Sequence, residues 1–546
     1  MNPEHIVVVN FTRMGDLVQS GPFLRSLKAA HPGARLTTVV FNAFADVARR
    51  LPMVDDVVVF DVDRWVPLLD AGRGDLQSAY AEATDFLGDS RLSDVDVLYN
   101  LAHTPQSATL CALMRPRQAL GRIRLDDGQM IVRGEWFNYL FSIMDERTFN
   151  PFNLVEICLR AGSGSGAAHA LELRVSDEDR RAAARLLLEA GIRPDARYVV
   201  LQPGASSRSR QWPPAYFAQL ASLLHTRGFA MVVVGSPAEK PLAESIISLS
   251  RQQAVSLVGQ TDVGTLAAVL EGAQRLVSND TGTIHLAAAV GTPSIGIYLG
   301  PAAAKDTAPY GNGHLVIEAD LPCAPCGYRD TCHTFSCHRR VTVDAVFRLC
   351  MANEQSLDET ARALAGMRVY RTQVDGRGEF ALKTLNDAVT GPDFALLSFY
   401  RVFWDNLLTA RPARADRSNA PRAEARSAWR QGAESLRTIL ESAERWLFAL
   451  LEEARKPAAD VRRLSSLLQG RIAVQNDLRR HAENFPQLSP VSRYLLLRLV
   501  SVRTGGLREH LEDMSSLLET YENAVALLTT ASAVRITERR EHVATA

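Results

Sequence analysis

The sequence predicts an α/β protein with two doubly wound domains in tandem, followed by an α-helical bundle. Short apolar runs alternate with amphipathic helical patterns over residues 1–350, which is typical of parallel βαβ units. Each of the two halves opens in the same way, with a strand, a polar loop and a helix. From about residue 391 glycines become few and long helical periodicity takes over, which indicates a helical bundle.

Composition excludes several classes of protein. Of the 546 residues 47% are apolar and 22% are charged, so a mostly disordered chain is excluded. The 61 basic and 61 acidic residues cancel, which gives no support to a nucleic-acid partner. No apolar run reaches the roughly 18 residues that cross a bilayer, and the first ten residues do not resemble a signal peptide. We therefore expect a cytoplasmic protein.

The first half is assigned to residues 1–175 and opens with a strand at 6–10. The polar loop that follows, Phe-Thr-Arg-Met-Gly-Asp, places Gly15 and Asp16 just before a helix. Gly15 would let the backbone approach a ligand closely. Asp16 is either a helix N-terminal carboxylate or a general base. The loop matches neither GxGxxG nor the Walker A pattern, which argues against a Rossmann dehydrogenase and a P-loop NTPase.

The second half is assigned to residues 176–350. It begins with a capping box, Ser176 to Asp179, on a helix that Gly191 closes. Four strands follow, predicted at 198–202, 231–235, 275–279 and 294–300. Because ligands bind such sheets at the carboxyl ends of the strands, the loops after the first and third of these strands are the candidate binding loops.

The loop after strand 198–202 combines small residues with arginines: Gly204, Ser206, Ser207, Arg208 and Arg210. Guanidinium groups pair bidentately with phosphate, so this loop suits a phosphate or pyrophosphate. The alternative is that the arginines are solvated surface residues.

The loop after strand 275–279 joins it to an apolar helix. Asp280 or Thr281 is expected to cap this helix, so that the backbone N–H groups of Thr281, Gly282 and Thr283 point at an anion. His285 falls on the first helical turn, where it is either a packing residue or part of the site.

Four of the seven cysteines lie within fifteen residues: Cys323, Cys326, Cys332 and Cys337. In a reducing compartment such a cluster is more often metal-binding than disulfide-bonded. Four thiolates can hold a structural zinc or iron tetrahedrally, with His333 and His338 as alternative ligands. An empty, reduced cluster is the main alternative, and a catalytic metal is least favoured. Cys111, Cys158 and Cys350 are expected to be buried structural thiols.

The remaining chain is divided at residue 390. Residues 351–390 are predicted to form two helices and a hairpin around Asp375-Gly376. Residues 391–546 are predicted to form the bundle, with a polar, proline-interrupted loop or linker at 411–430. Its helices carry apolar stripes that need burial within the bundle or against a partner, a second copy or a protein acceptor. These residues are Leu436, Ile439, Leu440, Trp446, Leu447 and Leu450.

Several motifs in order resemble glycosyltransferase family 9, the heptosyltransferase family, over roughly residues 5–350. They are Arg13-Met-Gly-Asp16 with Pro22, Pro203-Gly-Ala with Arg210-Gln-Trp-Pro, Val234-Gly-Ser-Pro-Ala-Glu239, Leu257-Val-Gly-Gln-Thr, and Asn279-Asp-Thr-Gly-Thr-Ile-His285 continuing to Pro293. The resemblance implies the GT-B architecture, in which two Rossmann-like domains face a cleft. It also implies inverting transfer from an ADP-activated heptose without a catalytic metal.

The resemblance also implies roles for single residues. Asp16 matches the proposed catalytic base, and Arg210 stands where the family usually has a lysine near the donor phosphates. Glu239 matches the acidic residue that holds the donor ribose. The other residues expected to bind substrate are Arg13, Gly15, Ser206, Arg208, Asp280, Thr281, Gly282, Thr283 and His285.

The resulting hypothesis is a glycosyltransferase that moves a heptose, or a related sugar, from an ADP-sugar to an acceptor hydroxyl. Lipopolysaccharide core is the usual acceptor in the family and would bring peripheral membrane contact. A protein such as flagellin or an autotransporter is the other acceptor class, towards which the C-terminal extension inclines us. The family resemblance also supports a cysteine-rich finger at 321–340, which carries iron in some protein-modifying members. A non-catalytic scaffold is a third hypothesis, against which the intact Asp16 and the Asp280-Thr281-Gly282 turn argue.

Overall fold

The computed structural model describes residues 3–68, 75–144, 147–162, 170–327, 332–388, 394–409, 423–454 and 461–500, and a few positions between 513 and 527. The chain forms two compact units. The first comprises Met1–Ala102, Leu113–Ala119 and Phe152–Gly391, and the second comprises His103–Ala112, Leu120–Pro151 and Pro392–Ala546. Among the described residues, no helix has the length and apolar character needed to cross a membrane.

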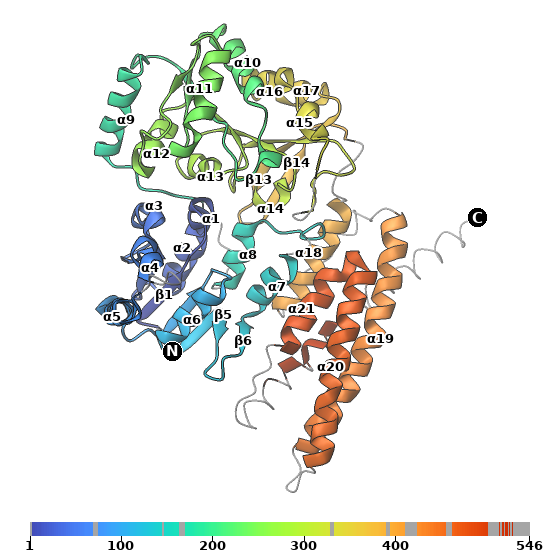
Figure 1. Ribbon diagram of the computed structural model, residues 1–546. Helices are drawn as coiled ribbons and strands as arrows, with labels where there is room; N and C mark the ends of the chain where they lie inside the picture. The colour runs from blue at the N-terminus through green and yellow to red at the C-terminus, as the bar shows by residue number, and fades with distance from the viewer. Residues whose placement is uncertain are drawn as a thin grey trace, which may run out of the picture. The chain divides into compact units, whose positions relative to one another are not determined.

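The first unit opens with a parallel sheet whose strands β1 to β4 run in the order β3-β2-β1-β4. Of these strands, β1 is labelled in Figure 1. All five residues of β1 are buried, as expected for a parallel strand covered on both faces. The strands are β1 (His5–Val9), β2 (Arg35–Phe41), β3 (Asp56–Phe60) and β4 (Val97–Asn100). The helices of this part are α1 (Met14–Gln19), α2 (Gly21–Ala30), α3 (Ala45–Arg50), α4 (Val62–Leu68), α5 (Leu76–Leu87) and, later in the chain, α8 (Leu154–Ala161).

The helix after β1 begins earlier than its sequence predicts. Arg13 has extended backbone at the N-cap, and Asp16 Oδ2 accepts the Arg13 N–H at 3.3 Å. This local bond starts α1 at Met14, so Gly15 and Asp16 lie in its first turn and not just before a helix.

The second sheet of this unit has eight strands in the order β14-β13-β12-β11-β10-β7-β8-β9. Six strands are parallel, and the predicted hairpin around Asp375 is confirmed, because β13 and β14 pair antiparallel beside β12. The strands are β7 (Tyr198–Gln202), β8 (Ala230–Val233), β9 (Val255–Ser256), β10 (Arg275–Asn279), β11 (Ser294–Tyr298), β12 (Leu315–Ala319), β13 (Met367–Val374) and β14 (Phe380–Thr384). The helices are α9 (Asp177–Glu189), α10 (Pro214–His225), α11 (Lys240–Leu249), α12 (Val263–Glu271), α13 (Gly282–Ala289), α14 (Ala304–Thr307), α15 (Ser336–Arg340), α16 (Val343–Met351) and α17 (Leu357–Arg362).

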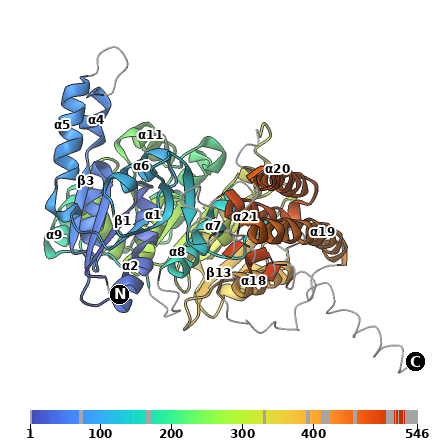
Figure 2. The ribbon, with the colours of Figure 1, turned by 90° about the horizontal axis from the view of Figure 1, so that it is seen from below.

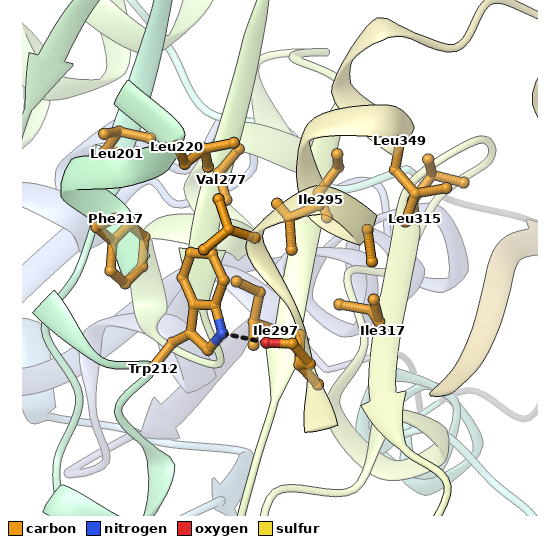
Figure 3. Close-up of a cluster of buried hydrophobic side chains, with 14 of the residues drawn as sticks. Leu201, Trp212, Phe217, Leu220, Val277, Ile295, Ile297, Leu315, Ile317 and Leu349 are labelled. Carbon is orange, nitrogen blue, oxygen red and sulfur yellow. Dashed lines mark hydrogen bonds between the residues drawn. The ribbon is translucent and has the colours of Figure 1, made fainter. Parts of the chain in front are cut away.

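One face of this sheet carries the core drawn in Figure 3. Val277, Ile295 and Ile317 come from neighbouring strands, and the fully buried Trp212 indole packs beside them. The indole Nε1–H donates to the Val341 carbonyl at 2.9 Å. Burial of a tryptophan therefore fixes the end of the loop that follows β7.

The predicted α/β class is confirmed, with two mainly parallel sheets and a helical C-terminal part. The four segment boundaries drawn from the sequence stay a prediction.

An ion pair joins the two sheet-bearing parts of the first unit. Arg50 of α3 donates to both carboxylate oxygens of Asp179 in α9, at 2.6 and 3.1 Å. The predicted capping box is confirmed, because Asp179 also accepts the Ser176 N–H at 2.8 Å and its own N–H donates to Ser176 Oγ at 3.1 Å. A Cβ on Gly264 of α12 would lie 2.2 Å from the Arg50 guanidinium carbon, so the glycine leaves the space that the guanidinium fills.

The second unit combines a short hairpin, several helices and a shared aromatic core. Its strands are β5 (Gln118–Arg124), which begins in the first unit, and β6 (Met130–Arg133). Its helices are α6 (Pro105–Leu113), whose last residue belongs to the first unit, α7 (Glu135–Ile143), α18 (Phe394–Thr409), α19 (Ala423–Ala454), α20 (Val461–Asn484) and α21 (Ser489–Val500). Helices α19, α20 and α21 pack side by side in chain order (Figures 1 and 2).

The C-terminal helices share their core with α7. The Trp404 ring lies 4.7 Å from the Tyr139 ring and 5.5 Å from the Tyr494 ring, measured between centroids. Tyr494 donates to the Glu135 carboxylate. Arg498 Nη1 lies 3.2 Å from Oε1 of the same carboxylate. Helix α7 is therefore part of the same packed unit as residues 394–500, although it lies far from them in the sequence.

Most of the apolar stripe of the predicted bundle is buried, with Leu436, Leu440 and Leu447 at 0% exposure, whereas Ile439 and Trp446 are half-buried. The predicted loop at 411–430 is partly wrong. Residues 411–422 lie outside the described part of the chain, but 423–430 are the first turns of α19. After Pro421 the segment is rich in alanine, glutamate and arginine, which are strong helix formers.

We predict that the Arg50–Asp179 pair makes folding stability depend on acid. Burial tends to raise the pKa of Asp179, but the hydrogen bonds from Arg50 and Ser176 outweigh it and hold the pKa at about 2. A depressed pKa stabilises the fold above the unfolded-state value near 4, and this contribution fades as pH falls towards 2. Wild type should exceed Asp179→Asn by about 2 kcal/mol at pH 6 and by roughly half of that at pH 3.

Urea unfolding at the two pH values measures this difference. Arg180→Gln is the control, because its ion pair with Glu271 is half exposed and such pairs contribute little. A difference between wild type and Asp179→Asn that stays constant with pH would contradict the assignment.

Candidate active site

Two glycines bring the helix after β1 against the helix after β10. A Cβ built on Gly15 would lie 2.9 Å from the Gly282 Cα, and one built on Gly282 would lie 3.0 Å from the Gly15 backbone nitrogen. Real Cβ atoms are not found so close to backbone, so any larger residue would push α1 and α13 apart. The sequence predicted a close backbone approach at Gly15 but not that its neighbour would be Gly282.

Asp16 stands beside this contact and next to the buried Asp280. Burial raises the pKa of Asp280, and the charge of Asp16 adds to that rise. Burial likewise raises the pKa of Cys158 in α8 to about 12, with a further contribution from Asp16. Asp16 is half-buried and Arg13 is exposed. The Asp16 carboxylate thus starts α1 and lies near enough to Asp280 for its charge to act on that carboxyl group.

Asp280 anchors Arg210 and does not cap the helix. Arg210 Nη2 donates to the Asp280 carboxylate and, at 3.0 Å, to the Asp280 carbonyl. Its Nη1 donates to Ser206 Oγ at 2.8 Å. Arg210 Nε is buried and has no hydrogen-bond partner among the described residues.

The N-terminus of α13 also presents donors. Thr281 occupies the N-cap position in extended backbone, but its side chain does not cap the helix. The first N–H groups of a helix have no partner within the helix, and they carry the positive end of its dipole. Gly282 and Thr283 supply these groups, and their binding of an anion stays a prediction, whereas the expected side-chain cap is absent.

Asn279 holds both ends of the loop formed by residues 203–212, which we call the arginine loop. Sequence reasoning missed this role. Its Nδ2 donates to the carbonyls of Pro203 and Gly204 at 2.8 and 3.0 Å, and its Oδ1 accepts the Trp212 N–H at 3.0 Å. The sequence signal that could have indicated this role is its place directly before Asp280, in the motif that begins at Asn279.

Glu239 lies over two glycines at the carboxyl ends of β7 and β8. Its Oε2 accepts the Ser236 N–H at 2.6 Å, and a Cβ on Gly204 would lie 1.4 Å from its Oε1. A Cβ on Gly235 would lie 2.6 Å from Oε2. The two glycines therefore make room for this carboxylate, and its predicted contact with a ribose stays a prediction.

His285 is buried against Gly15, since a Cβ there would lie 3.0 Å from the imidazole Cδ2. Burial lowers the pKa of His285 to about 3, and His314 adds to this effect. The ring is therefore neutral at physiological pH. Its Nδ1 has no hydrogen-bond partner among the described residues, which is consistent with a site role as well as with packing.

The cysteine cluster is described except for residues 328–331. Within the described part of the chain, no three His, Cys, Asp or Glu side chains are arranged to hold a metal ion. Cys332 Sγ accepts the Phe335 N–H at 3.4 Å, and this backbone bond lowers the pKa of Cys332. His338 Nε2 lies 2.9 Å from the Ser209 carbonyl, so this nitrogen is engaged and does not act as a ligand.

We predict that loss of Arg210 destabilises the protein through the Asp280 that it leaves behind. Arg210→Ala should cost about 2 kcal/mol, because a buried carboxylate loses its partner. Burial already raises the pKa of Asp280, and without Arg210 it should rise further, so the cost should grow as pH rises and shrink in acid.

Urea unfolding at pH 5 and pH 8 checks this sign. Arg197→Ala, which removes a guanidinium lying 4.7 Å from the Phe229 ring centroid, is the matched control and should show no pH dependence. A cost for Arg210→Ala that is equal at both pH values would contradict the anchoring role.

The chain is similar to known proteins along the length that carries these loops. A family model described as glycosyltransferase family 9 (heptosyltransferase) matches residues 165–334. Lipopolysaccharide heptosyltransferase 1 of Pseudomonas aeruginosa is 26% identical over 338 residues, which cover 60% of this chain and 87% of that protein. Lipooligosaccharide heptosyltransferase 2 of Haemophilus influenzae is 32% identical over 120 residues, 21% of this chain and 34% of that protein.

Among solved structures, E. coli ADP-heptose LPS heptosyltransferase II is similar at a TM-score of 0.47 with 18% identity, over 63% of this chain and 96% of that one. The family predicted from the motifs is confirmed by the family model and the curated relatives. Residues 165–334 thus form a domain that matches glycosyltransferase family 9, the heptosyltransferase family.

Proposed function

We propose that this enzyme transfers a heptose from ADP-heptose to a hydroxyl group of lipopolysaccharide core. The observation that carries the proposal is the contact between Gly15 and Gly282. It brings a carboxylate at the start of α1 next to the anion-binding N-terminus of α13, so one site holds a candidate base and a candidate diphosphate cradle.

Asp16 is the base of the proposed mechanism. Inverting transfer is a single displacement at the anomeric carbon, and the attacking hydroxyl must lose its proton as the new bond forms. Asp16 is half-buried and lies beside the turn Asp280-Thr281-Gly282, which would bind the sugar donor. Its carboxylate would accept that proton. Burial lowers the pKa of the neighbouring His285 and so disfavours its protonated form, which makes the carboxylate the proposed acceptor for the proton.

The α13 N-terminus and Arg210 stabilise the departing diphosphate. Negative charge grows on the leaving oxygen in the transition state, and fixed donors are effective there because they need no reorganisation. The Gly282 and Thr283 N–H groups are such donors, and the Arg210 guanidinium, held by Ser206 and Asp280, adds fixed positive charge. Asp280 holds the guanidinium in place and does not itself face the phosphates as a ligand. Arg208, exposed in the same loop, adds positive charge.

Relatives support a glycolipid acceptor. The curated relatives are named lipopolysaccharide or lipooligosaccharide heptosyltransferases. These names give no support to a protein acceptor, which the C-terminal extension had favoured. Transfer to a protein is therefore one of the outcomes that the test distinguishes.

The test is transfer by the purified full-length chain. ADP-heptose is supplied together with lipopolysaccharide from a strain whose core lacks heptose, and the acceptor mass is followed. Gain of one heptosyl unit supports the proposal. If only protein in a matched lysate is labelled, the acceptor is a protein and not a glycolipid. Donor binding without any transfer would favour a non-catalytic scaffold.

We predict that Asp16→Asn lowers turnover by about 10²–10⁴, the usual range for loss of a general base. The affinity for ADP should change less than twofold, because the phosphate donors lie on α13 and the arginine loop. Calorimetric binding of ADP and initial rates measure the two effects. Asp46→Asn is a matched control, since it removes a first-turn carboxylate from another helix of the same sheet. Wild-type turnover by a folded Asp16→Asn protein would refute the role of Asp16 as base.

The structural metal at the four cysteines also stays a proposal. Four thiols in fifteen residues, one of them accepting a backbone N–H, are a suitable donor set for zinc or iron. A bound metal would hold the segment together and would take no part in the transfer. We expect about one zinc or iron per untagged chain by elemental analysis. Cys323→Ser should remove it and lower the melting temperature, whereas Cys350→Ser should leave the metal in place. Metal-free wild-type protein would exclude the site.

A further inference from the structure

We propose that His338 is a positioning residue for the donor diphosphate and acts through the backbone of the arginine loop. The inference rests on the proposed function, because it concerns the same donor site. Neither the motifs nor the predicted metal ligands account for the contact that this histidine makes.

The contact fixes a peptide plane. His338 Nε2 lies 2.9 Å from the Ser209 carbonyl oxygen, and a carbonyl only accepts, so Nε2 carries the proton. The Ser209 carbonyl and the Arg210 N–H belong to one planar peptide unit. Holding that oxygen therefore sets the direction in which the Arg210 side chain leaves the backbone.

The same carbonyl is enclosed from a second side. Gly300 has a positive φ of 60°, and a Cβ on it would lie 2.7 Å from the Ser209 oxygen. The Gly300 carbonyl accepts the Cys326 N–H at 2.9 Å. The Ser209 oxygen thus lies between a histidine and a glycine that are both tied to the cysteine-rich segment.

The imidazole is itself held firmly. His338 is 8% exposed, its neighbour Cys337 is part of the hydrophobic core, and the Phe335 ring lies 5.1 Å from the imidazole. Three residues further on, the Val341 carbonyl accepts the Trp212 indole N–H. The arginine loop is therefore held by Asn279 on one side and by residues 338–341 on the other.

The chain offers a matched control. His481 Nε2 contacts the Gly432 carbonyl at 2.8 Å and is 2% exposed, but it belongs to the second unit. His338→Phe and His481→Phe each remove one buried imidazole bond to a backbone carbonyl. Only the first removes it from the arginine loop. His338→Gln keeps an N–H donor of similar reach.

The experiment measures the ADP dissociation constant, the KM for ADP-heptose, kcat and the melting temperature of the full chain. We expect His338→Phe to raise the dissociation constant and KM about tenfold, the effect of losing one buried hydrogen bond, with a smaller change in kcat. His338→Gln should restore affinity to within about threefold. His481→Phe should lower the melting temperature and leave ADP affinity unchanged.

Gly300→Ala gives an independent reading, because the added methyl group displaces the same carbonyl from its other side. We expect it to weaken ADP binding as well. Unchanged ADP affinity in folded His338→Phe or Gly300→Ala would overturn the inference, and so would equal loss in His481→Phe. Wild-type protein that does not bind ADP would instead refute the proposed function itself.

Discussion

The candidate site depends on the close approach of two backbones, at Gly15 and Gly282. Neither position has room for a Cβ, so the first turns of α1 and α13 lie in direct contact. In the proposed mechanism, this contact lets a carboxylate of α1 and the N–H donors of α13 serve one reaction. The Arg50–Asp179 pair adds a second attachment between the same two parts. The Arg50–Asp179 pair joins the two parts through a buried, charge-assisted hydrogen bond. At the two glycines, by contrast, the absence of side chains lets the backbones come into contact.

Positive charge in the site is held by other protein groups before any ligand arrives. Asp280 and Ser206 occupy part of the Arg210 fork, and the Arg210 Nε–H is left without a partner among the described residues. A guanidinium fixed in this way loses little freedom when an anion binds. The arrangement also explains how an arginine can stand where the family usually has a lysine. Its extra donors are used to fix its own position.

The C-terminal helices are not a separate addition to the fold. Trp404 and Tyr494 pack with Tyr139, and Glu135 of α7 receives bonds from Tyr494 and Arg498. A chain cut near residue 390 would lack Trp404 and Tyr494 and would expose the Tyr139 ring of α7 to water. Loss of function after such a cut would therefore reflect a broken core and would not by itself show that the helices bind an acceptor.

The sequence by itself determined the fold class, the strands near 198–202 and 275–279, the capping box at Ser176 and the family, because these follow from local periodicity and from motifs whose residues are adjacent in the chain. It also placed Asp16, Arg210 and Asp280 among the site residues. Only the tertiary structure decided what those residues contact. The anchoring of Arg210 by Asp280, the pairing of Arg50 with Asp179, the bridging by Asn279 and the bond of His338 to Ser209 all join residues between 67 and 129 positions apart. No local pattern encodes such pairings, since they arise when the sheets pack and bring the strand ends and loops together.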